Sequence, residues 1–247
     1  MKKILVIPAR FNSSRLPGKP LADVVGKPLI QRVFERAKLV KGFDRLVLAV
    51  DDERVEAAAK SFGAEVMMTD PNLASGTDRV AAVAEKIEGD LFVNFQGDEP
   101  LLSPQAVEAA AALVASGKFG MGTVMTPIRA MEDLWARSVV KVLVDAQGRA
   151  LYFSRLPIPY GKVSGPAPGE SFICRKHLGV YAYDRATLFR VRDLPEGSLE
   201  KAEKLEQLRA LEAGIPIGVA EGDYSSIGVD TFEDLEKVRK HITAFGV

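Results

Sequence analysis

The chain has 247 residues, of which 47% are hydrophobic, and this fits one large α/β domain or a domain with a sizeable insertion. Its 33 Lys and Arg residues balance 33 Asp and Glu residues, so the formal net charge is zero, unlike that of a protein built to hold a nucleic-acid backbone electrostatically. No run of about 18 apolar residues could span a bilayer, and the single Cys174 excludes an internal disulfide and a multi-cysteine metal site.

The first part of the chain alternates between short apolar runs and amphipathic stretches. Its first apolar run ends at Pro8, too early for the apolar core of a signal peptide, so we expect a cytoplasmic protein. Asp51 and Asp52 follow the second run and can cap the next helix. The expected strands are residues 4–7, 45–50, 66–68 and 91–95, and the expected helices are residues 29–40, 78–87 and 104–114. This alternation predicts an α/β fold with a Rossmann-like, mostly parallel sheet flanked by helices.

The pattern changes after about residue 120, where strands follow one another with little helix between them. The expected strands are residues 121–128, 139–144, 150–154, 177–183 and 217–220. Residues 145–148 are typical of a hairpin turn, and residues 161–169, rich in Gly and Pro, of a mobile surface loop. An amphipathic helix is predicted over residues 200–213, with Ala202 on its apolar face, and a closing helix over residues 231–242.

These patterns divide the chain into two parts of one compact unit. Residues 1–120 and 215–247 form the expected α/β core, and residues 121–214 the antiparallel insertion. An insertion of this kind commonly forms a lid or a dimer surface, and both remain open at this point.

A basic loop of small residues follows the first strand and carries Arg10, Ser13, Arg15 and Lys19. Because the carboxyl edge of an open α/β sheet is where ligands bind, the loop is placed to meet one. Three cations within about ten residues suit a polyanion such as a triphosphate, although the loop has neither the P-loop spacing nor G-x-G-x-x-G. The alternative is an ordinary strand-to-helix loop with solvated cations.

Two acidic side chains stand out elsewhere. Asp98 follows the strand at 91–95, where a carboxylate can bind Mg²⁺, while Glu99 could turn away or assist packing. Asp230 precedes a helix whose expected cap is Thr231, with Asp234 at the capping-box position, so Asp230 is free for another role. The two carboxylates could share a metal if both reach one sheet edge. The alternatives are turn hydrogen bonds for Asp98 and stabilisation of the helix dipole for Asp230.

Further polar residues suit a nucleoside and a sugar. Small residues at the helix start near residues 74–79 could hydrogen-bond a nucleobase or ribose. Strand alternation puts His177, Gly179 and Tyr181 on one face, and Arg155 could clamp a carboxylate. Hydrogen bonds suited to sugar hydroxyls are offered by Glu206 and Gln207. Packing or solvated roles are the alternatives for this group.

Taken together, these stretches resemble the 3-deoxy-manno-octulosonate cytidylyltransferases, also called CMP-KDO synthetases. The matching segments, in family order, are IPARFNSSRLPGKPL, SGTDR, NFQGDEP, ALYFSR, KHLGVYAY, LEQLR and GVDTFEDLE. The resemblance implies a fold of the nucleotide-diphospho-sugar transferase type. It also implies a homodimer formed through the sugar-binding insertion and a cytoplasmic enzyme of lipopolysaccharide biosynthesis, with no nucleic-acid or membrane partner.

The reaction implied is CTP plus KDO, an eight-carbon 2-keto sugar acid, giving CMP-KDO and pyrophosphate. The implied metal ligands, for a Mg²⁺ cofactor, are Asp98 and Asp230, which join Arg10 and Lys19 as catalytic residues. The implied nucleotide-binding residues are Ala9, Arg10, Ser13, Arg15, Lys19, Ser75, Gly76 and Thr77. The implied sugar-binding residues are Gln96, Arg155, His177, Tyr181, Glu206 and Gln207.

Two alternatives to a KDO cytidylyltransferase remain open. One is a cytidylyltransferase for another ulosonate, such as 8-amino-KDO or sialic acid, because the first loop and Arg155 fit any sugar of the α-keto acid type. The other is a nucleotide-binding module without catalysis, for which the two distant aspartates and the sugar-side cluster would be superfluous.

Overall fold

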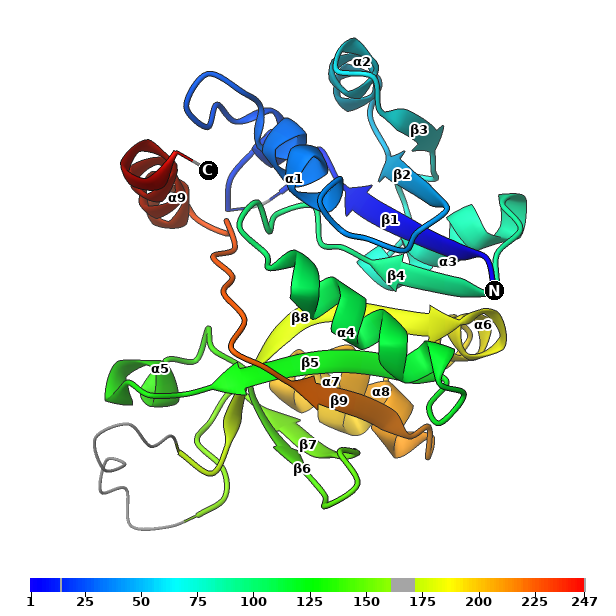
Figure 1. Cartoon of the computed structure of the whole chain (residues 1–247), viewed down its shortest axis with the longest axis vertical. Helices are drawn as coiled ribbons and strands as arrows, with labels where there is room; N and C mark the ends of the chain where they lie inside the picture. Colours follow the sequence, from blue (N-terminus) through cyan, green and yellow to red (C-terminus); the bar gives the residue numbers. More distant parts are fainter. Residues whose placement is uncertain (14, 161–171, 247) are drawn as a thin grey trace. The chain divides into compact units, whose positions relative to one another are not determined.

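The computed structural model describes residues 1–13, 15–160 and 172–246, which divide into two compact units (Figure 1). The first unit is Met1–Glu108 with Ser225–Val247, and the second is Ala109–Tyr224. Residues 215–224, expected in the core, group with the second unit because β9 (Ile217–Glu221) pairs along its length with β5 (Met121–Pro127). Among the described helices, none has the length and apolar character of a membrane span.

The first unit is built on a parallel sheet with the strand order β3-β2-β1-β4. Its strands are β1 (Lys3–Ala9), β2 (Arg45–Val50), β3 (Glu65–Met68) and β4 (Leu91–Asn94). Every residue of β1 from Ile4 to Ala9 is buried, as is every residue of β4, because helices cover both faces of the sheet. The parallel pairing confirms the predicted fold class and explains the continuous apolar runs.

Helices of the first unit lie on both sides of this sheet, with α1 in front and α3 behind in Figure 1. They are α1 (Leu29–Ala37), α2 (Glu53–Ser61), α3 (Gly76–Lys86) and α9 (Phe232–Phe245), with a short 3-10 helix, η1 (Lys19–Leu21). Asp52 caps α2 by accepting from the backbone N of Arg54, which confirms the predicted cap. The helix α4 (Pro104–Ala115) crosses from the first unit into the second.

The second unit contains a mixed sheet. Its remaining strands are β6 (Lys141–Val144), β7 (Ala150–Ser154) and β8 (Arg175–Asp184). β8 pairs antiparallel with β5 and β6, and the predicted hairpin joins β6 to β7 with Gly148 at φ +75° in its turn. Two helices were not predicted, α5 (Met131–Trp135) and α6 (Arg185–Arg192). The loop predicted at residues 161–169 lies outside the described residues.

The single helix predicted over residues 200–213 is wrong, because two helices occupy this stretch. They are α7 (Ser198–Glu203) and α8 (Gln207–Glu212), separated by Lys204 in the left-handed region at φ +55°. An ion pair between Glu200 and Arg209 joins them at 2.6 Å, and Ala202 is exposed rather than part of an apolar face. Apolar spacing continues across the break, so periodicity alone does not reveal it.

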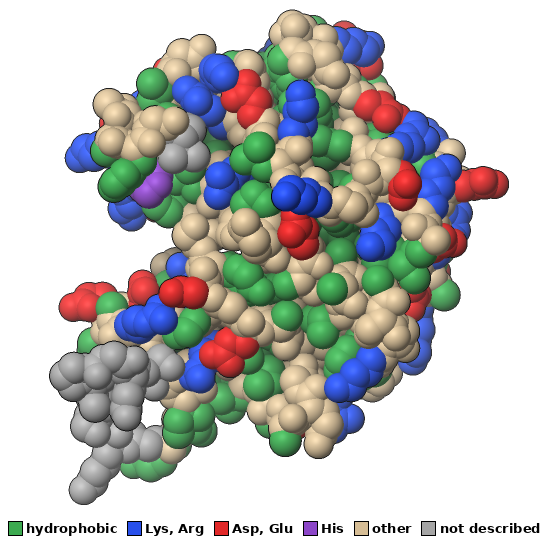
Figure 2. Space-filling model, in the orientation of Figure 1, with side chains coloured by type: hydrophobic (Ala, Val, Ile, Leu, Met, Phe, Trp, Pro, Cys, Tyr) green, Lys and Arg blue, Asp and Glu red, His purple; other side chains and the backbone are tan. Residues whose placement is uncertain are grey.

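The environment of Cys174 and the distribution of charge on the surface are both as the sequence predicts. Cys174 packs in a small core with Ile128 and Leu134, and burial raises the pKa of its thiol. This makes it a packing residue rather than a nucleophile. On the face drawn in Figure 2, basic and acidic side chains are interspersed, as the balanced composition leads one to expect.

The left-handed conformation of Lys204, between α7 and α8, can be tested by substitution. Lys204→Gly removes the side chain from a left-handed residue, so we expect the free energy of unfolding to rise by about 1 kcal/mol. Lys201→Gly, the same substitution inside α7, should lower it by about 1 kcal/mol. Urea unfolding of both variants measures this, and a loss of stability in Lys204→Gly would contradict the strain argument.

Candidate active site

A pocket of about 320 Å³ lies at the carboxyl ends of β1 and β4, within the first unit. It is lined by Pro8, Ala9, Arg10, Asn12, Ser13, Arg15, Lys19, Pro20, Gly76, Gln96, Gly97, Asp98 and Asp230. The basic loop and both predicted acids therefore reach the same edge of the sheet, where open α/β folds bind their ligands.

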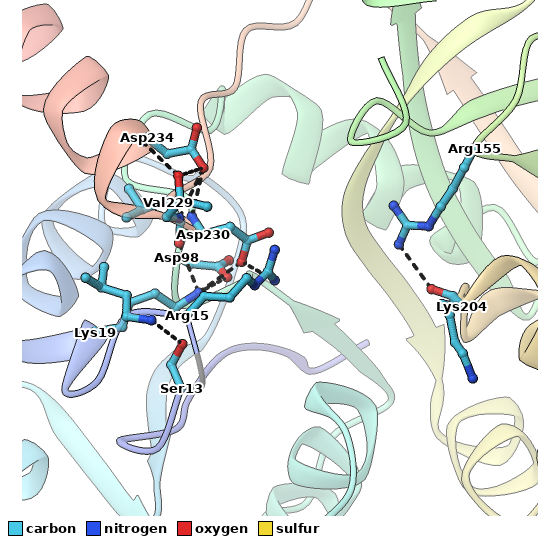
Figure 3. A network of polar contacts seen from close by, with 11 residues as sticks. Ser13, Arg15, Lys19, Asp98, Arg155, Lys204, Val229, Asp230 and Asp234 are labelled. Carbon is cyan, nitrogen blue, oxygen red and sulfur yellow. Dashed lines mark hydrogen bonds and ion pairs between the residues drawn. The ribbon is translucent and has the colours of Figure 1, made fainter. Parts of the chain in front are cut away.

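The ammonium of Lys19 is the centre of this pocket's charge network (Figure 3). Its Nζ lies 2.7 Å from Oδ2 of Asp98, 3.0 Å from the carbonyl oxygen of Val229 and 3.4 Å from Oδ1 of Asp230. Arg15 adds an ion pair of 3.0 Å to the same Oδ1 of Asp230. Two carboxylates far apart in the sequence thus converge on one cation, and the three N–H groups of Lys19 are all used.

Backbone contacts explain how the two acids arrive together. The N–H of Val229 donates to the carbonyl of Asp98 at 2.9 Å, which ties the segment before α9 to the loop after β4. Thr231 caps α9 in a reciprocal capping box with Asp234, as predicted, so the carboxylate of Asp230 is not needed as the cap. Glu99 instead accepts a hydrogen bond from Ser226, which fits the prediction that it turns away.

Two glycines allow the loops to approach one another. A side-chain carbon at Gly97 would lie 2.4 Å from the carbonyl oxygen of Pro8, so the end of β1 and the loop after β4 meet only because this residue has none. Gly18 precedes η1 at φ +67°, a conformation that glycine adopts at no steric cost. The ring of Phe11 lies beside it, 3.4 Å from where a side-chain carbon would stand, so the backbone conformation and not the space calls for glycine here.

The other predicted nucleotide residues fall into two groups. Arg10 lines the pocket, and within residues 1–13, 15–160 and 172–246 its guanidinium has neither a hydrogen bond nor an ion pair. Ala9 and Gly76 also line it, as does Ser13, whose Oγ accepts from the N–H of Leu16 at 3.3 Å. The side chains at the start of α3 do not line it: Ser75 caps the helix by accepting from the N–H of Asp78, and Thr77 is buried.

In the second unit, Arg155 binds the backbone. Its Nε donates to the carbonyl of Glu203 at 2.8 Å and Nη1 to that of Arg137 at 3.1 Å. Its Nη2 donates to the carbonyl of Lys204 at 3.2 Å (Figure 3). Three of its five N–H groups therefore have structural partners. The carbonyl of Arg155 itself accepts from buried Lys141 at 3.0 Å, so the residue is held from both sides.

His177 and Tyr181 are both buried in β8, with ring centroids 5.3 Å apart. Oγ1 of Thr123 lies 2.7 Å from the carbonyl of Val180 and 2.9 Å from Nε2 of His177. A carbonyl can only accept, so the one hydroxyl proton goes to Val180 and Nε2 of His177 must donate to Thr123. This assigns the tautomer with Nδ1 as the acceptor, and burial lowers the pKa of His177 to about 3.

Burial also keeps Tyr181 neutral by raising the pKa of its phenol, and its hydroxyl has no hydrogen-bond partner in the described part of the chain. Gln207 is buried at the start of α8, and Glu206 immediately precedes it. His177, Tyr181 and Gln207 are therefore uncharged, in contrast to the cations and carboxylates of the first unit.

Sequence reasoning missed the role of Val229, whose carbonyl binds Lys19, and that of Arg79, which is buried against Asp51. No side-chain signal marks a carbonyl as a ligand. For Arg79 the sequence holds a weak signal of burial. It directly follows Asp78, which completes the capping box of α3, and so lies in the first turns of a helix that covers the sheet.

Cations and carboxylates at the carboxyl edge of a parallel sheet, around a pocket of this size, are typical of nucleotide-binding α/β domains. A family model described as cytidylyltransferase matches residues 4–219. Among curated proteins, the 3-deoxy-manno-octulosonate cytidylyltransferase of Syntrophotalea carbinolica is 48% identical over 96% of this chain and 97% of its own length. The protein of the same name from Solibacter usitatus is 49% identical over 97% of this chain and 94% of its own.

Solved structures of similar proteins agree with these sequence comparisons. One, of CMP:2-keto-3-deoxy-manno-octonic acid synthetase complexed with CTP, is 45% identical with a TM-score of 0.90 and covers 99% of both chains. A cytidylyltransferase from Leptospira borgpetersenii, 18% identical with a TM-score of 0.65 over 99% of this chain and 88% of its own, shares the fold. The chain belongs to the cytidylyltransferase family, and within it to the 3-deoxy-manno-octulosonate cytidylyltransferases.

The buried His177 predicts a pH dependence of stability. Its folded pKa, about 3, lies below the ordinary value of 6.5, so the unfolded chain takes up a proton between these values and the folded chain does not. Stability is therefore full above pH 6.5 and falls on acidification. We expect the free energy of unfolding of His177→Gln to fall less steeply, by about 1.4 kcal/mol per pH unit near pH 4–5.

Urea unfolding at several pH values measures this slope. The matched control is His241→Gln in α9, which should keep the slope of the unchanged protein. Equal slopes for His177→Gln and the unchanged protein would contradict the buried, neutral imidazole.

Proposed function

We propose that this protein transfers the cytidylyl group of CTP to the 2-hydroxyl of KDO, giving CMP-KDO and pyrophosphate for lipopolysaccharide biosynthesis. The observation that carries the proposal is the convergence of Lys19, Asp98 and Asp230 in one pocket of the nucleotide-binding unit. Its relatives, named for this reaction, match nearly the whole chain. A relative has been solved in complex with CTP.

The cations of the first loop would hold the triphosphate. Arg10 is the cation best placed for it, since its guanidinium has no protein partner within the described residues. The hydrogen bond from Lys19 to Asp230, at 3.4 Å, is its longest and the one most readily exchanged for a phosphate oxygen. Main-chain atoms at Ala9 and Gly76 line the same pocket and would contact the nucleoside, with Ser13 and Arg15 assisting at the phosphates.

The chemistry is a direct displacement. The sugar 2-oxygen forms a bond to the α-phosphorus and loses its proton, while the bond from that phosphorus to the β-phosphate bridging oxygen breaks and pyrophosphate leaves. Such a reaction depends on positioning and on neutralising charge rather than on a covalent protein nucleophile. This agrees with the packing role of Cys174.

The carboxylates of Asp98 and Asp230 fit a Mg²⁺ ion. Both approach the same ammonium, so both can reach a single cation, and carboxylate oxygens combined with substrate phosphates are the ligands that Mg²⁺ prefers. When bound, the ion would offset the charge of the triphosphate and lower the pKa of the sugar hydroxyl. The protein residues Asp98 and Asp230 would hold it.

The residues that would bind the sugar include both neutral and charged groups. In the first unit Gln96 lines the pocket. In the second, Nδ1 of His177 is an acceptor for a hydroxyl, and the phenol of Tyr181 has no protein partner among the described residues. Two N–H groups of Arg155 remain for the sugar carboxylate. The last members of this sugar-binding group are Glu206 and Gln207.

We also propose a homodimer and a cytoplasmic location. Apolar side chains of the second unit, Trp135, Leu151 and Leu156, are each more than half exposed, and a second copy of the chain would cover them. The location follows from the proposed substrate, because CTP is a cytoplasmic nucleotide. No nucleic-acid or membrane partner is proposed.

A pyrophosphate-release assay with CTP, UTP, ATP and GTP, each with KDO, 8-amino-KDO and sialic acid, tests the activity. We expect release only with Mg²⁺, CTP and KDO together, and a fall of about a hundredfold in kcat for Asp98→Asn, because a charged group at the reacting phosphates is lost. The control is Asp90→Asn, at the other end of β4, which should keep normal turnover. Preference for another ulosonate would overturn the substrate, and CTP binding without turnover would favour a non-catalytic module.

The metal site has a test that does not need turnover. Lys19→Gln removes the ammonium that competes with a divalent cation for Asp98 and Asp230. We therefore expect Mn²⁺ to bind this variant about tenfold more tightly without nucleotide, since a full positive charge within about 4 Å is removed. Paramagnetic resonance of free Mn²⁺ measures the affinity. Lys27→Gln, which breaks an exposed pair with Glu35, is the control, and equal affinities in both variants would refute a metal site at these carboxylates.

A further inference from the structure

Arg79, on α3, carries a fully buried guanidinium that the reaction described above does not use. Nη2 lies 3.1 Å from Oδ2 of Asp51, and Nη1 donates to Oγ1 of Thr69 and, at 3.4 Å, to the carbonyl of Asp70. Its Nε is buried without a hydrogen-bond partner in the part of the chain that the structure describes. A buried charge with an unsatisfied donor is costly, and the ion pair with Asp51 is the contact that offsets this cost.

Asp51 connects this arginine to the phosphate loop. It follows β2, and its side chain is 7% exposed. While Oδ2 faces Arg79, Oδ1 accepts a hydrogen bond of 2.9 Å from the backbone N–H of Phe11, the residue after Arg10. One carboxylate thus joins α3, the end of β2 and the start of the loop.

The ring of Phe11 is also held. The guanidinium of Arg54 lies over it, 3.6 Å from the ring centroid, and the same arginine is paired with Asp52. On another side the ring lies next to Gly18, within contact distance of where a side-chain carbon would stand. The main chain beside Arg10 is therefore fixed by a hydrogen bond and the ring beyond it by packing, and a binding loop ordered in advance loses less entropy when its ligand arrives.

The negative charge of Asp51 also acts on the guanidinium of Arg79. Burial lowers the pKa of Arg79, the nearby charge of Arg10 lowers it further, and the carboxylate of Asp51 raises it. Asp51 therefore compensates the buried guanidinium of Arg79, with which it forms the ion pair of 3.1 Å.

We propose that Asp51 and Arg79 form a positioning pair, which fixes the backbone at Phe11 and thereby holds the guanidinium of Arg10 ready for the phosphates of the nucleotide. The inference rests on the proposed function, because it takes the ligand to be a nucleoside triphosphate. Neither residue contacts the reacting atoms in this role, and both act through Arg10.

Two double variants separate positioning from stability. Asp51→Asn/Arg79→Met and Asp51→Leu/Arg79→Met both remove the two buried charges with side chains of similar shape, but only the first keeps an oxygen that can accept from Phe11. We expect the second to bind CTP about five to ten times more weakly than the first, the value of one lost hydrogen bond. CMP, which lacks the outer phosphates, should lose less than about twofold.

Calorimetry of the full chain at 25 °C with CTP and with CMP measures these affinities. The control is Glu65→Gln, at the opposite end of the β2–β3 pair, which removes the ion pair between Arg45 and Glu65. This variant should bind both nucleotides like the unchanged protein. Equal CTP affinity in the two double variants, or equal losses for CTP and CMP, would overturn the positioning role. Failure of the unchanged protein to bind CTP at all would instead overturn the proposed function, and the inference with it.

A measurement on the unchanged protein covers the case in which a double variant does not fold. The amide of Phe11 should exchange with deuterium markedly more slowly than that of Asn12, because the carboxylate of Asp51 holds the first, and Asn12 is exposed. Equal exchange rates for the two amides would refute the proposed hydrogen bond in solution.

Discussion

One ammonium, that of Lys19, joins the parts of the chain on which the site depends. It connects the loop after β1 to Asp98 after β4 and to the segment before α9, residues separated by 79 and 211 positions. Two carboxylates this close to one another repel unless a cation lies between them. Lys19 and Arg15 therefore compensate the two carboxylates before any ligand enters, while Arg10 adds a positive charge that no carboxylate of the described residues pairs with.

The pairing of Lys19 and Arg15 with carboxylates has a consequence for binding. A triphosphate brings several negative charges to a pocket in which Lys19 and Arg15 are already paired with carboxylates. Charge beyond what Arg10 can offset requires either an added cation or an exchange of these pairs, and the longest contact, the one of 3.4 Å from Lys19 to Asp230, is the one most readily exchanged. Arg10 differs because no carboxylate of the described residues pairs with its guanidinium, so it can meet an anion without first breaking a pair.

The features that the sequence predicted best are those set by residues close together in the chain. The caps at Asp52 and Thr231 follow from side chains within three residues of the groups they bind, and the strands of the first unit follow from apolar runs. Lys204 was missed because its left-handed conformation interrupts a stretch whose apolar spacing continues unbroken. The partners of Arg155 and Arg79 are backbone carbonyls and a carboxylate brought near by tertiary packing, and no spacing rule identifies such partners.

The convergence of Asp98 and Asp230 was predictable for a different reason. Carboxyl ends of parallel strands share one edge, so an acid directly after a buried strand has a known place, and an acid not needed as a helix cap is available. What remained beyond the sequence was the Val229-to-Asp98 hydrogen bond that places the second acid, because it is made by the backbone alone.

The two units also differ in the kind of polar group they offer, and this difference bears on the proposed substrates. In the first unit the groups are charged and bind one another, as suits the phosphates of a nucleotide. In the second, burial holds His177 and Tyr181 neutral, and the hydroxyl of Thr123 fixes which imidazole nitrogen can accept. A neutral acceptor with a fixed tautomer recognises a hydroxyl group better than it does a carboxylate. Of the proposed sugar-side residues in this unit, Arg155 is therefore the one suited to the acid group of the sugar, while His177 and Tyr181 are suited to its hydroxyls.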